Sequence, residues 1–525
     1  MHKNLKAALV FASFLALAGC EGDDGSDGAD GAAGAAGAAG PAGPAGPAGP
    51  AGPAGPAGSG GGSAEISGDT VTTAANDLRG LNYATVAPHA NKIYASGHVG
   101  TTDATRQIVV ARFFADGTPD ASFGGDGFVE LEATPGIVGG SDEISYGVAE
   151  LQGGDVVAVT TAIDADGGSS IYLFRLDADG NQVAGWGDAQ GKAEVVFGWA
   201  NADNATYPGA PATFPVDLAW DLQVDRSIAG DRVVVFGQGS AGDGVRTDRD
   251  RYVARVNITA VGAEADPTFN GGSAYTYNAT GVLNDSQRRG IVEADGKIVA
   301  AGYTDLGGVL DNHSFMIRLA ADGTLDATFG GFSDEPTIPA TPGIAVFNPF
   351  KVDGGYAENY AVGFQAGTSS YIAVGYGEAT LRDSMTGSTL GYETSLAQDV
   401  VVFRVSSGTS AGIDTSWGNV GTQAVQSEGQ GFPTNEDRGR HLIMLPDDRS
   451  VVAGRFGGNP AAFVFDADGQ LDDRVFGDGI AELPNDTVTS QFFGLAVSPD
   501  GNRVAMSTNS NDNGARVVVL NLGLD

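Results

Sequence analysis

The stretch from Gly290 to Gly331 decides the fold: it reads GIVEADGKIVAAGYT, passes through a loop and resumes as FMIRLAADGTLDATFGG. Two short apolar runs meet across Asp295-Gly296. Asp-Gly between apolar runs is a strong hairpin signal, because Gly readily adopts the positive φ that a tight turn needs. The stretch therefore predicts antiparallel strands at 292–293, 298–301 and 315–319, and a fourth strand after a Pro-rich loop at 344–347.

The same unit recurs along the chain. Six further copies begin near residues 81, 147, 221, 362, 441 and 494. Four antiparallel strands per repeat of about 40 to 60 residues are typical of a propeller blade. We therefore expect an all-β chain in which residues 64–525 form one domain, a seven-bladed β-propeller.

The last repeat predicts how the ring of blades closes. An aromatic anchor follows the second turn in six repeats: Phe123, Trp186, Phe269, Phe329, Trp417 and Phe476. The seventh repeat has only three strands, and a strand-like run, ISGDTVTT at 66–73, stands unpaired before the first repeat. We expect this run to complete the seventh blade as its outer strand, because pairing removes an exposed sheet edge.

The pattern DGKIV-AG…RL-ADGTLD-TFG-G resembles the delta-sixty repeat family, a bacterial propeller-type repeat. The stretch 290–331 matches this pattern closely, the first and sixth repeats match well, and the others depart by insertions, a lost turn glycine or a missing second half. The resemblance covers roughly residues 66–525. It implies a β-propeller, and it brings no catalytic residues because the family has no settled activity.

The N-terminal residues predict export and a lipid anchor. Residues 1–19 begin with positive charge and contain an apolar run, 7–17, that is too short for a bilayer span of about 20 residues. The sequence Leu-Ala-Gly-Cys that ends at Cys20 resembles the bacterial lipoprotein cleavage box. We therefore expect a signal peptide at 1–19 and a lipidated Cys20; the alternative is an incidental cysteine after an ordinary secretory signal. Glu21 follows, which by analogy with lipoprotein sorting favours the bacterial outer membrane and a surface-exposed protein.

Residues 20–63 predict a spacer behind this anchor. Gly occupies every third position from Gly22 to Gly58, first in acidic triplets and later in Gly-Pro-Ala triplets. Strict Gly periodicity is what a collagen triple helix requires, and a triple helix would make a homotrimer. We favour a monomeric, collagen-like low-complexity spacer, because the run is short and Pro occupies only one of the two non-Gly positions.

The charge and the residue composition limit the kinds of molecule that the protein is expected to bind. The formal net charge of −37 argues against binding of nucleic acid and of anionic lipid head groups, which leaves the acyl anchor as the membrane contact.

The sequence does not predict a metal site from its histidines, because no two of them have metal-ligand spacing. Asp-x-Asp-Gly at Asp164, Asp177 and Asp466 resembles the start of a Ca²⁺ loop, but the distal Glu is missing and each copy falls where a turn is needed. We expect no cofactor, with Ca²⁺ as the alternative.

Some charged residues recur with the repeat. Third strands carry an arginine, and an aspartate stands three residues before the anchor: Arg112, Arg175, Arg255, Arg318 and Arg404, with Asp120, Asp266, Asp326, Asp414 and Asp473. Such recurrence indicates a structural Arg–Asp bridge within or between blades. A ligand site would break the symmetry of the repeat.

The loops fall on two faces of a propeller. The turns between first and second strands and between third and fourth strands are mostly short, so we name that side the short-turn face. Nearly all variation in length lies on the opposite side, the long-loop face, where binding usually lies; the alternative is neutral drift of surface loops. Our ligand-binding candidates on that face are Arg246, Arg249, Arg251, Trp199, Tyr207, Phe350 and Phe432. His441 begins an inner strand, and we favour a packed or solvated histidine over one that lines the channel.

These observations predict a bacterial cell-surface lipoprotein whose propeller is a non-catalytic binding or display module for an extracellular protein or polysaccharide. One alternative is an extracellular polysaccharide hydrolase or lyase with its site in the central funnel; buried acids with raised pKa at the channel mouth would favour it. Another is a structural envelope protein trimerised by the collagen-like stalk. An open polar face with aromatic platforms would favour binding.

Overall fold

The computed structural model describes most of the predicted propeller. The described residues are 64–100, 105–133, 143–163, 169–189, 191–195, 217–240, 249–277, 279, 284–307, 312–347, 357–378, 398–409, 412–418, 422–425, 437–483, 491–509 and 514–523. All of them belong to one compact unit, residues 58–525. The signal peptide and the collagen-like spacer lie outside the described residues.

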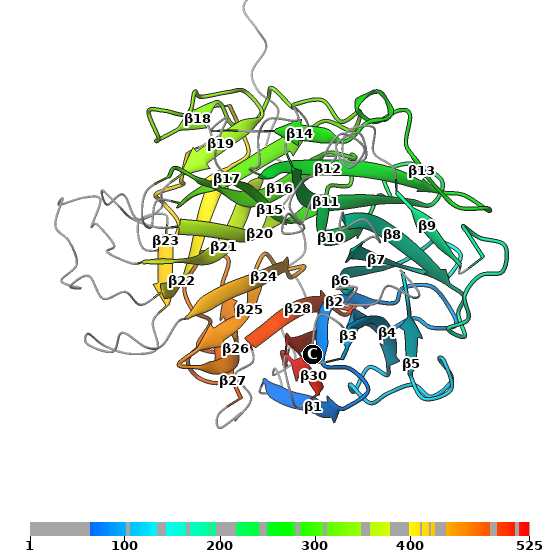
Figure 1. Ribbon diagram of the computed structural model, residues 1–525. Helices are drawn as coiled ribbons and strands as arrows, with labels where there is room; N and C mark the ends of the chain where they lie inside the picture. Colours follow the sequence, from blue (N-terminus) through cyan, green and yellow to red (C-terminus); the bar gives the residue numbers. More distant parts are fainter. Residues whose placement is uncertain are drawn as a thin grey trace, which may run out of the picture. The chain divides into compact units, whose positions relative to one another are not determined.

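Seven antiparallel blades surround a common axis, as the repeats predict (Figure 1). Blade one consists of β2 (Asp77–Tyr83), β3 (Ile93–Val99), β4 (Gln107–Phe113) and β5 (Phe128–Leu131). Blade two consists of β6 (Ile144–Glu150), β7 (Val156–Ile163), β8 (Ser169–Leu176) and β9 (Lys192–Glu194). Blade three consists of β10 (Asp217–Val224), β11 (Arg232–Ser240), β12 (Arg249–Ile258) and two short strands on β12, β13 (Ala263–Ala265) and β14 (Tyr275–Tyr277), with the 3₁₀ turn η1 (Asn270–Gly272) between them.

The remaining blades follow the same order from the axis outward. Blade four consists of β15 (Asp285–Val292), β16 (Ile298–Asp305), β17 (Asn312–Leu319) and β19 (Ile344–Phe347), with β18 (Phe332–Ser333) parallel to β19. Blade five consists of β20 (Ala357–Gln365), β21 (Ser370–Glu378), β22 (Gln398–Ser406) and β23 (Thr422–Val425). Blade six consists of β24 (Arg438–Met444), β25 (Ser450–Phe456), β26 (Asn459–Phe465) and β27 (Ile480–Glu482). No helix among these residues is long and apolar enough to cross a membrane.

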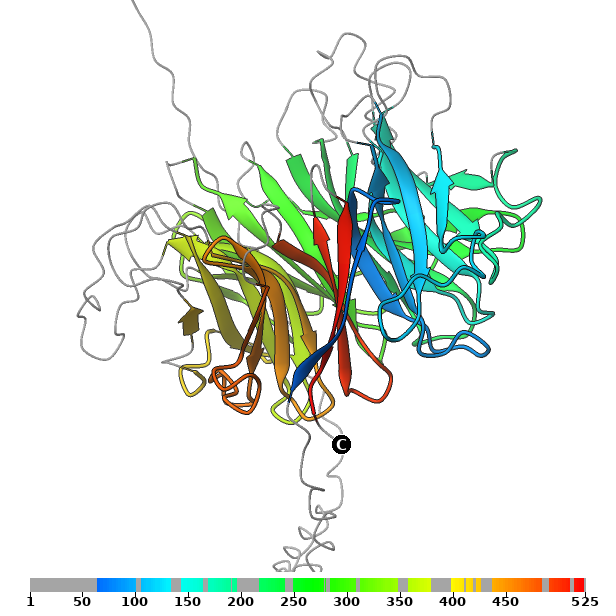
Figure 2. The same cartoon turned by 90° about the horizontal axis from the view of Figure 1, so that it is seen from below.

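Blade seven closes the ring as predicted. It consists of β28 (Gln491–Val497), β29 (Arg503–Asn509), β30 (Ala515–Asn521) and, as outer strand, β1 (Glu65–Thr72). Figure 2 shows β1, in dark blue, beside the red β30. Glu65 pairs with Asn521, and Asn521 pairs with Arg503 next to the short turn that follows β28. The closing strand therefore begins at the short-turn face.

The hydrophobic core lies between neighbouring blades. Seven clusters of buried apolar side chains occupy the seven interfaces between blades, one for each adjacent pair. Five predicted anchors are buried in these clusters: Phe123, Trp186, Phe269, Phe329 and Trp417. The residue after each anchor donates its backbone N–H to a carbonyl in the turn of the next blade, for example Gly124 to Asp179 at 2.9 Å.

The sixth predicted anchor is wrong. Phe476 is 42% exposed, whereas the preceding Val475 is 1% exposed and takes the buried position. Blade seven explains the change, because its third strand, β30, is not followed by the turn that accepts the hydrogen bond in the other blades.

Candidate functional site

The recurring charges join strands and blades. Arg112 binds Asp120 at 2.7 Å, Arg255 binds Asp266 at 2.8 Å, Arg318 binds Asp326 at 2.9 Å and Arg404 binds Asp414 at 2.7 Å. Three of these guanidinium groups also donate to a carbonyl of the next blade: Arg112 to Ala178, Arg255 to Ala321 and Arg318 to Ser407. The structure thus brings four of the predicted arginines into ion pairs with four of the predicted aspartates.

Two blades depart from this pattern. Arg175 of blade two binds Asp155 at 2.7 Å, because Val183 stands where the other blades have the aspartate. In blade six the acid is Asp472, which binds Arg449 at 3.0 Å, and the neighbouring Asp473 predicted from the sequence is one residue out of place. The predictions of Asp473 and of Phe476 are wrong for the same reason: in blade six the motif lies one residue earlier in the sequence.

Most candidates on the long-loop face cannot be placed. Arg246, Trp199, Tyr207, Phe350 and Phe432 lie outside the described residues. Arg249 is described and half-buried at the start of β12.

The remaining candidate, Arg251, does not belong to an exposed patch. It is 1% exposed, its guanidinium donates to Asp285 at 3.0 Å, and it lies 3.5 Å from the centroid of the Phe315 ring. The cause is strand alternation: Arg251 lies inside β12, with its side chain toward blade four.

The Asp-x-Asp-Gly segments are turns. Asp177 accepts hydrogen bonds from the backbone N–H groups of Asp179 and Asn181, and Asp466 accepts them from Asp468 and Gln470. The third segment, at Asp164, lies outside the described residues. The described part of the chain contains no group of three or more His, Cys, Asp or Glu side chains that could hold a metal ion.

A feature of the channel was not predicted from the sequence. Each of the seven inner strands has a β-bulge at the same position, next to the axis. Bulges re-aim side chains, and they are frequent near functional sites. The bulged residues, which we call the bulge ring, are Arg79, Tyr146, Trp220, Arg288 with Arg289, Tyr360, Arg440 and Phe493.

Arginine and aromatic side chains contact one another around the bulge ring. Arg79 lies 4.6 Å from the Tyr146 centroid, and the Tyr146 and Trp220 centroids are 4.6 Å apart. Arg288 lies 4.1 Å from the Trp220 ring and 4.9 Å from the Tyr360 ring. These cation–π contacts replace part of the hydration that buried guanidinium groups lose.

The other side of the ring closes in the same way. Arg440 lies 4.5 Å from the Tyr360 centroid, and its Nε donates to Gln491 of blade seven at 2.9 Å. Arg79 lies 5.3 Å from the Phe493 centroid, which completes the circuit.

Arg289 crosses the channel at the level of this ring. Its guanidinium binds Asp221 of blade three at 3.4 Å. It also donates to the backbone carbonyls of Arg79, at 3.0 Å, and Phe493, at 3.2 Å, in blades one and seven. Arg289 comes from blade four and therefore links four blades across the axis.

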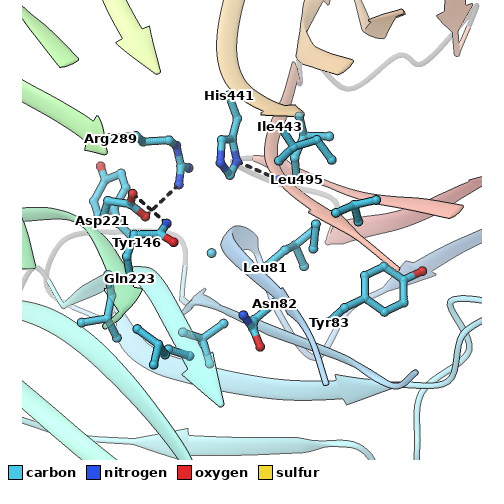
Figure 3. A pocket seen from close by; sticks show the side chains of 18 of the residues that line it. Leu81, Asn82, Tyr83, Tyr146, Asp221, Gln223, Arg289, His441, Ile443 and Leu495 are labelled. Carbon is cyan, nitrogen blue, oxygen red and sulfur yellow. Dashed lines mark hydrogen bonds and ion pairs between the residues drawn. The ribbon is translucent and has the colours of Figure 1, made fainter. Parts of the chain in front are cut away.

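A pocket of about 320 Å³ lies on one side of Arg289 (Figure 3). Its walls are the second halves of inner strands, including residues 80–83, 146–149, 221–224 and 495–497, and they extend to Arg226 in the turn after β10. Inner strands run from the long-loop face to the short-turn face, so the pocket occupies the short-turn half of the channel. Its inner end is formed by Asp221, Arg289, His441 and Tyr146.

Burial and charge set the protonation of this inner end. Burial raises the pKa of Asp221, against the opposing charge of Arg289 and a hydrogen bond from Gln223. Burial also lowers the pKa of Arg289, although Asp221 opposes this. Burial, with a smaller effect of the Arg289 charge, holds the pKa of His441 well below its usual value, so this imidazole is neutral.

The hydrogen bonds of His441 define its tautomer. Nδ1 of His441 accepts the backbone N–H of Leu495 at 2.9 Å. The proton of the neutral ring is therefore on Nε2. His441 is buried and hydrogen-bonded, as expected of a packed histidine, and it also lines the pocket in the channel.

The pocket provides mainly hydrogen-bond donors. Asp221 is the single carboxylate among its described lining residues, and its oxygens accept from Arg289, from Gln223 at 3.1 Å and from the backbone of Gly290 at 3.2 Å. Glycoside hydrolysis normally requires two carboxyl groups that flank the bond to be cleaved. The arrangement can bind a polar group, but it does not supply the usual acid–base pair.

A sequence signal for the bulge ring exists in retrospect. In every repeat an Arg or a large aromatic residue stands at the bulge, and an aliphatic residue comes two positions later. In four repeats the residue between them is a glycine: Gly80, Gly147, Gly290 and Gly494. Two of these glycines explain the close approach of the inner strands. A Cβ on Gly80 would lie 2.9 Å from the Cα of Gly147, and a Cβ on Gly147 would lie 2.6 Å from the Cβ of Leu222.

Comparison with known proteins agrees with the fold. Residues 91–123 and 293–329 match the family model "Domain of unknown function (DUF5122) beta-propeller". No curated protein matches the sequence significantly.

Several solved structures are distantly similar to this chain. One, from the "Crystal Structure of Mitotic Checkpoint Complex", has a TM-score of 0.38 at 10% identity, with 87% of this chain and 91% of that chain covered. A glucose dehydrogenase has a TM-score of 0.34 at 11% identity, with 68% and 93% covered. The endo-arabinase from Bacteroides thetaiotaomicron VPI-5482 has a TM-score of 0.27 at 13% identity, with 59% and 92% covered. At these values the similarities say nothing about ligand or reaction; the chain is a seven-bladed β-propeller with a matching propeller family model over two of its repeats.

Proposed function

We propose that the protein is an exported, lipid-anchored binding protein whose propeller holds a polar group of an extracellular ligand in the channel pocket without transforming it. The anchor part of the proposal comes from the Leu-Ala-Gly-Cys sequence that ends at Cys20 and from the Gly-rich spacer behind it. Replacing Cys20 with Ser should move the protein from the membrane fraction to the soluble fraction of Gram-negative cells. An unchanged membrane fraction would contradict a lipid anchor.

The observation that carries the binding function is the pocket itself. Its volume of about 320 Å³ lies at the lower end of the range for ligand sites. Its inner end brings together Arg289, His441 and Tyr146, and its walls add the polar side chains of Asn82 and Gln223. A concave site with a few convergent polar groups is the usual form of a small-ligand site.

The position of this pocket changes the side on which we propose binding. The sequence favoured the long-loop face, but among its candidates Arg251 is buried and Arg249 is the one half-buried residue in the described part of the chain. The aromatic faces of the bulge ring, which would serve as platforms on that side, are already stacked on arginines. The described geometry therefore supports the short-turn half of the channel.

The main alternative is a polysaccharide hydrolase or lyase in the same channel. The raised pKa of Asp221 favours this alternative, because a general acid needs a proton near neutral pH. Against it, Asp221 accepts three hydrogen bonds and no second carboxylate is among the described lining residues. Non-catalytic binding is thus the better supported function.

Measuring both binding and product formation distinguishes a binding protein from a hydrolase or lyase. We would run the mature full chain in affinity electrophoresis through gels that contain neutral or acidic polysaccharides, and measure new reducing ends and unsaturated products after long incubation. Retardation by at least one polysaccharide without product is expected. Product formation that is lost in Asp221→Asn would establish the hydrolase or lyase instead.

A further inference from the structure

We infer that the pocket is specific for a carboxylate flanked by hydroxyl groups on a ligand of monosaccharide size, such as one hexuronate unit. The inference rests on the proposed binding function and names the ligand class of the same pocket. It comes from the charge of the lining, from two sets of available donors and from one acceptor that has no partner.

The charge of the pocket is opposite to that of the protein. The chain carries a formal net charge of −37. Among the described lining residues the cations are Arg226 and Arg289 and the anion is Asp221, which gives two positive charges and one negative charge while His441 is neutral. A site with a net positive charge favours an anionic ligand over a neutral one, even in a protein whose overall charge is negative.

Asp221 does not prevent anion binding. Its carboxylate accepts hydrogen bonds from Arg289, Gln223 and the backbone N–H of Gly290, so its lone pairs face these donors. Figure 3 shows Asp221 directed toward Arg289 and Gln223, with His441 on the other side of Arg289. A carboxylate ligand could bind the Arg289 guanidinium and the His441 imidazole, which both lie at the inner end of the pocket.

His441 supplies a directed donor. Its side chain is nine-tenths buried, and the structure gives its Nε2–H no hydrogen-bond partner among the described residues. Because Nδ1 is held by Leu495, the ring cannot turn to satisfy Nε2 elsewhere without losing that bond. An N–H group fixed in this way is suited to an anionic oxygen.

Arg289 and Arg226 supply the charged donors. A guanidinium has five N–H groups, and Arg289 uses three of them on Asp221 Oδ1 and the carbonyls of Arg79 and Phe493, which leaves two among the described contacts. Arg226 is exposed at the rim, where it donates to the backbone carbonyl of Glu150 at 2.9 Å. Arginine pairs well with carboxylates because its planar donors match two carboxylate oxygens.

Asn82 explains why hydroxyl groups should accompany the carboxylate. The Oδ1 atom of Asn82 is buried and has no hydrogen-bond partner among the described residues. This atom has almost no exposed surface, so a ligand hydroxyl can reach it only after the amide turns. Asn82 nevertheless lines the pocket, and its amide can both donate to and accept from hydroxyl groups. One sugar ring presents a carboxylate and hydroxyls within a volume that a pocket of about 320 Å³ accommodates.

The test is isothermal titration calorimetry on the mature full chain with four sugars and one small anion. D-galacturonate and D-glucuronate are compared with D-galactose and D-glucose, and acetate reports binding of any carboxylate. We expect at least one uronate to bind at least about tenfold more tightly than its neutral counterpart, as one charged hydrogen bond would give. Acetate should bind more weakly than that uronate.

Three variants locate the binding. Arg226→Gln removes the rim charge, and His441→Asn removes the Nε2 donor while its side-chain oxygen can still accept from Leu495. Each should weaken uronate binding about tenfold and leave the thermal midpoint near that of the wild type. Arg474→Gln is the control, because Arg474 is 69% exposed and outside the pocket lining, and it should leave binding unchanged.

The outcomes separate this inference from the function on which it rests. Equal affinity for uronates and neutral sugars, reduced in both cases by His441→Asn, would overturn the anion preference and keep the pocket as the site. Uronate binding that none of the pocket variants changes would show surface adsorption and overturn the inference. Binding of none of the sugars, while the chain is still retarded by a polysaccharide, would overturn the inference alone; absence of both would also remove the proposed function.

Discussion

Arg289 is the residue that joins the two functions of the channel, cohesion and binding. It is 5% exposed and binds Asp221 and two backbone carbonyls from blades on the other side of the axis. A buried ion pair adds little by itself, but removing one partner leaves an unpaired charge in a dry site. The same guanidinium forms the inner end of the pocket, so its stability and its chemistry are linked.

We therefore expect Arg289→Met to lower the free energy of unfolding by about 3–5 kcal/mol. Urea unfolding followed by circular dichroism measures this change. The double variant Arg289→Met with Asp221→Leu removes both charges and should recover most of the loss. The exposed Arg474→Gln should cost less than about 1 kcal/mol. If Arg289→Met costs no more than Arg474→Gln, the link across the axis does not stabilise the ring.

Among the elements, β1 is the strand that closes the ring. It is the outer strand of blade seven and pairs with β30 from Glu65 to Thr72. In an antiparallel pair the N–H groups of an edge strand point alternately toward the partner and toward solvent. Proline has no backbone N–H. Of two single variants with proline at successive positions, one therefore loses a hydrogen bond to β30 and the other keeps all of them.

Asp69→Pro and Thr70→Pro are the matched pair. One of them should lower the free energy of unfolding by about 1–3 kcal/mol, because a carbonyl of β30 loses its donor, and the other should have a smaller effect. Thermal and urea unfolding of both proteins measure the difference. Two proteins as stable as the wild type would show that the seventh blade does not need its fourth strand.

The repeated acid of the blades predicts how the propeller responds to low pH. Burial alone would raise the pKa of Asp120, Asp266, Asp326, Asp414 and Asp472, but hydrogen bonds and the paired arginines hold each of them below the ordinary value of 3.8. A carboxyl whose pKa is lowered by folding stabilises the protein above the unfolded value, and that stabilisation is lost as the pH falls through the folded value. The buried Asp221 has the opposite shift and partly offsets this loss.

We expect the thermal midpoint to fall steadily as the pH drops below about 4, since five carboxylates must then take up protons on unfolding. Asp326→Asn should be less stable than the wild type near neutral pH and closer to it at low pH. Calorimetry from pH 6 to pH 2 follows both proteins. A midpoint that does not change below pH 4 would contradict the role of the Arg–Asp pairs.

At the level of elements, local signals predicted the fold well and the site poorly. Asp-Gly turns and the repeated strands indicated seven blades, and the unpaired run before the first repeat indicated closure by β1. The bulge ring was missed because strand alternation predicts which face a side chain occupies only while the register is regular, and a bulge changes that register. Arg251 was misplaced for the related reason that its direction depends on where β12 begins.

The whole molecule combines a propeller with an N-terminal segment that the sequence predicts to be a spacer. We expect the chain from Glu21 and the propeller from Ser63 both to be monomers, because the Gly-X-Y run is short. Light scattering on both proteins measures their mass. A trimeric long form beside a monomeric propeller would show a collagen-like stalk, and binding by three propellers together would then contribute to affinity.

The short-turn half of the channel should hold the ligand. The direct test is a calorimetric titration of Asn82→Trp, which fills the pocket from β2, with the polysaccharide that retards the wild type. Val261→Trp adds the same side chain at a position that is 69% exposed and outside the pocket, and it is the control. We predict that Asn82→Trp loses binding while its thermal midpoint and the affinity of Val261→Trp stay near those of the wild type. Wild-type affinity in a folded Asn82→Trp protein would show that the ligand does not bind in this half of the channel.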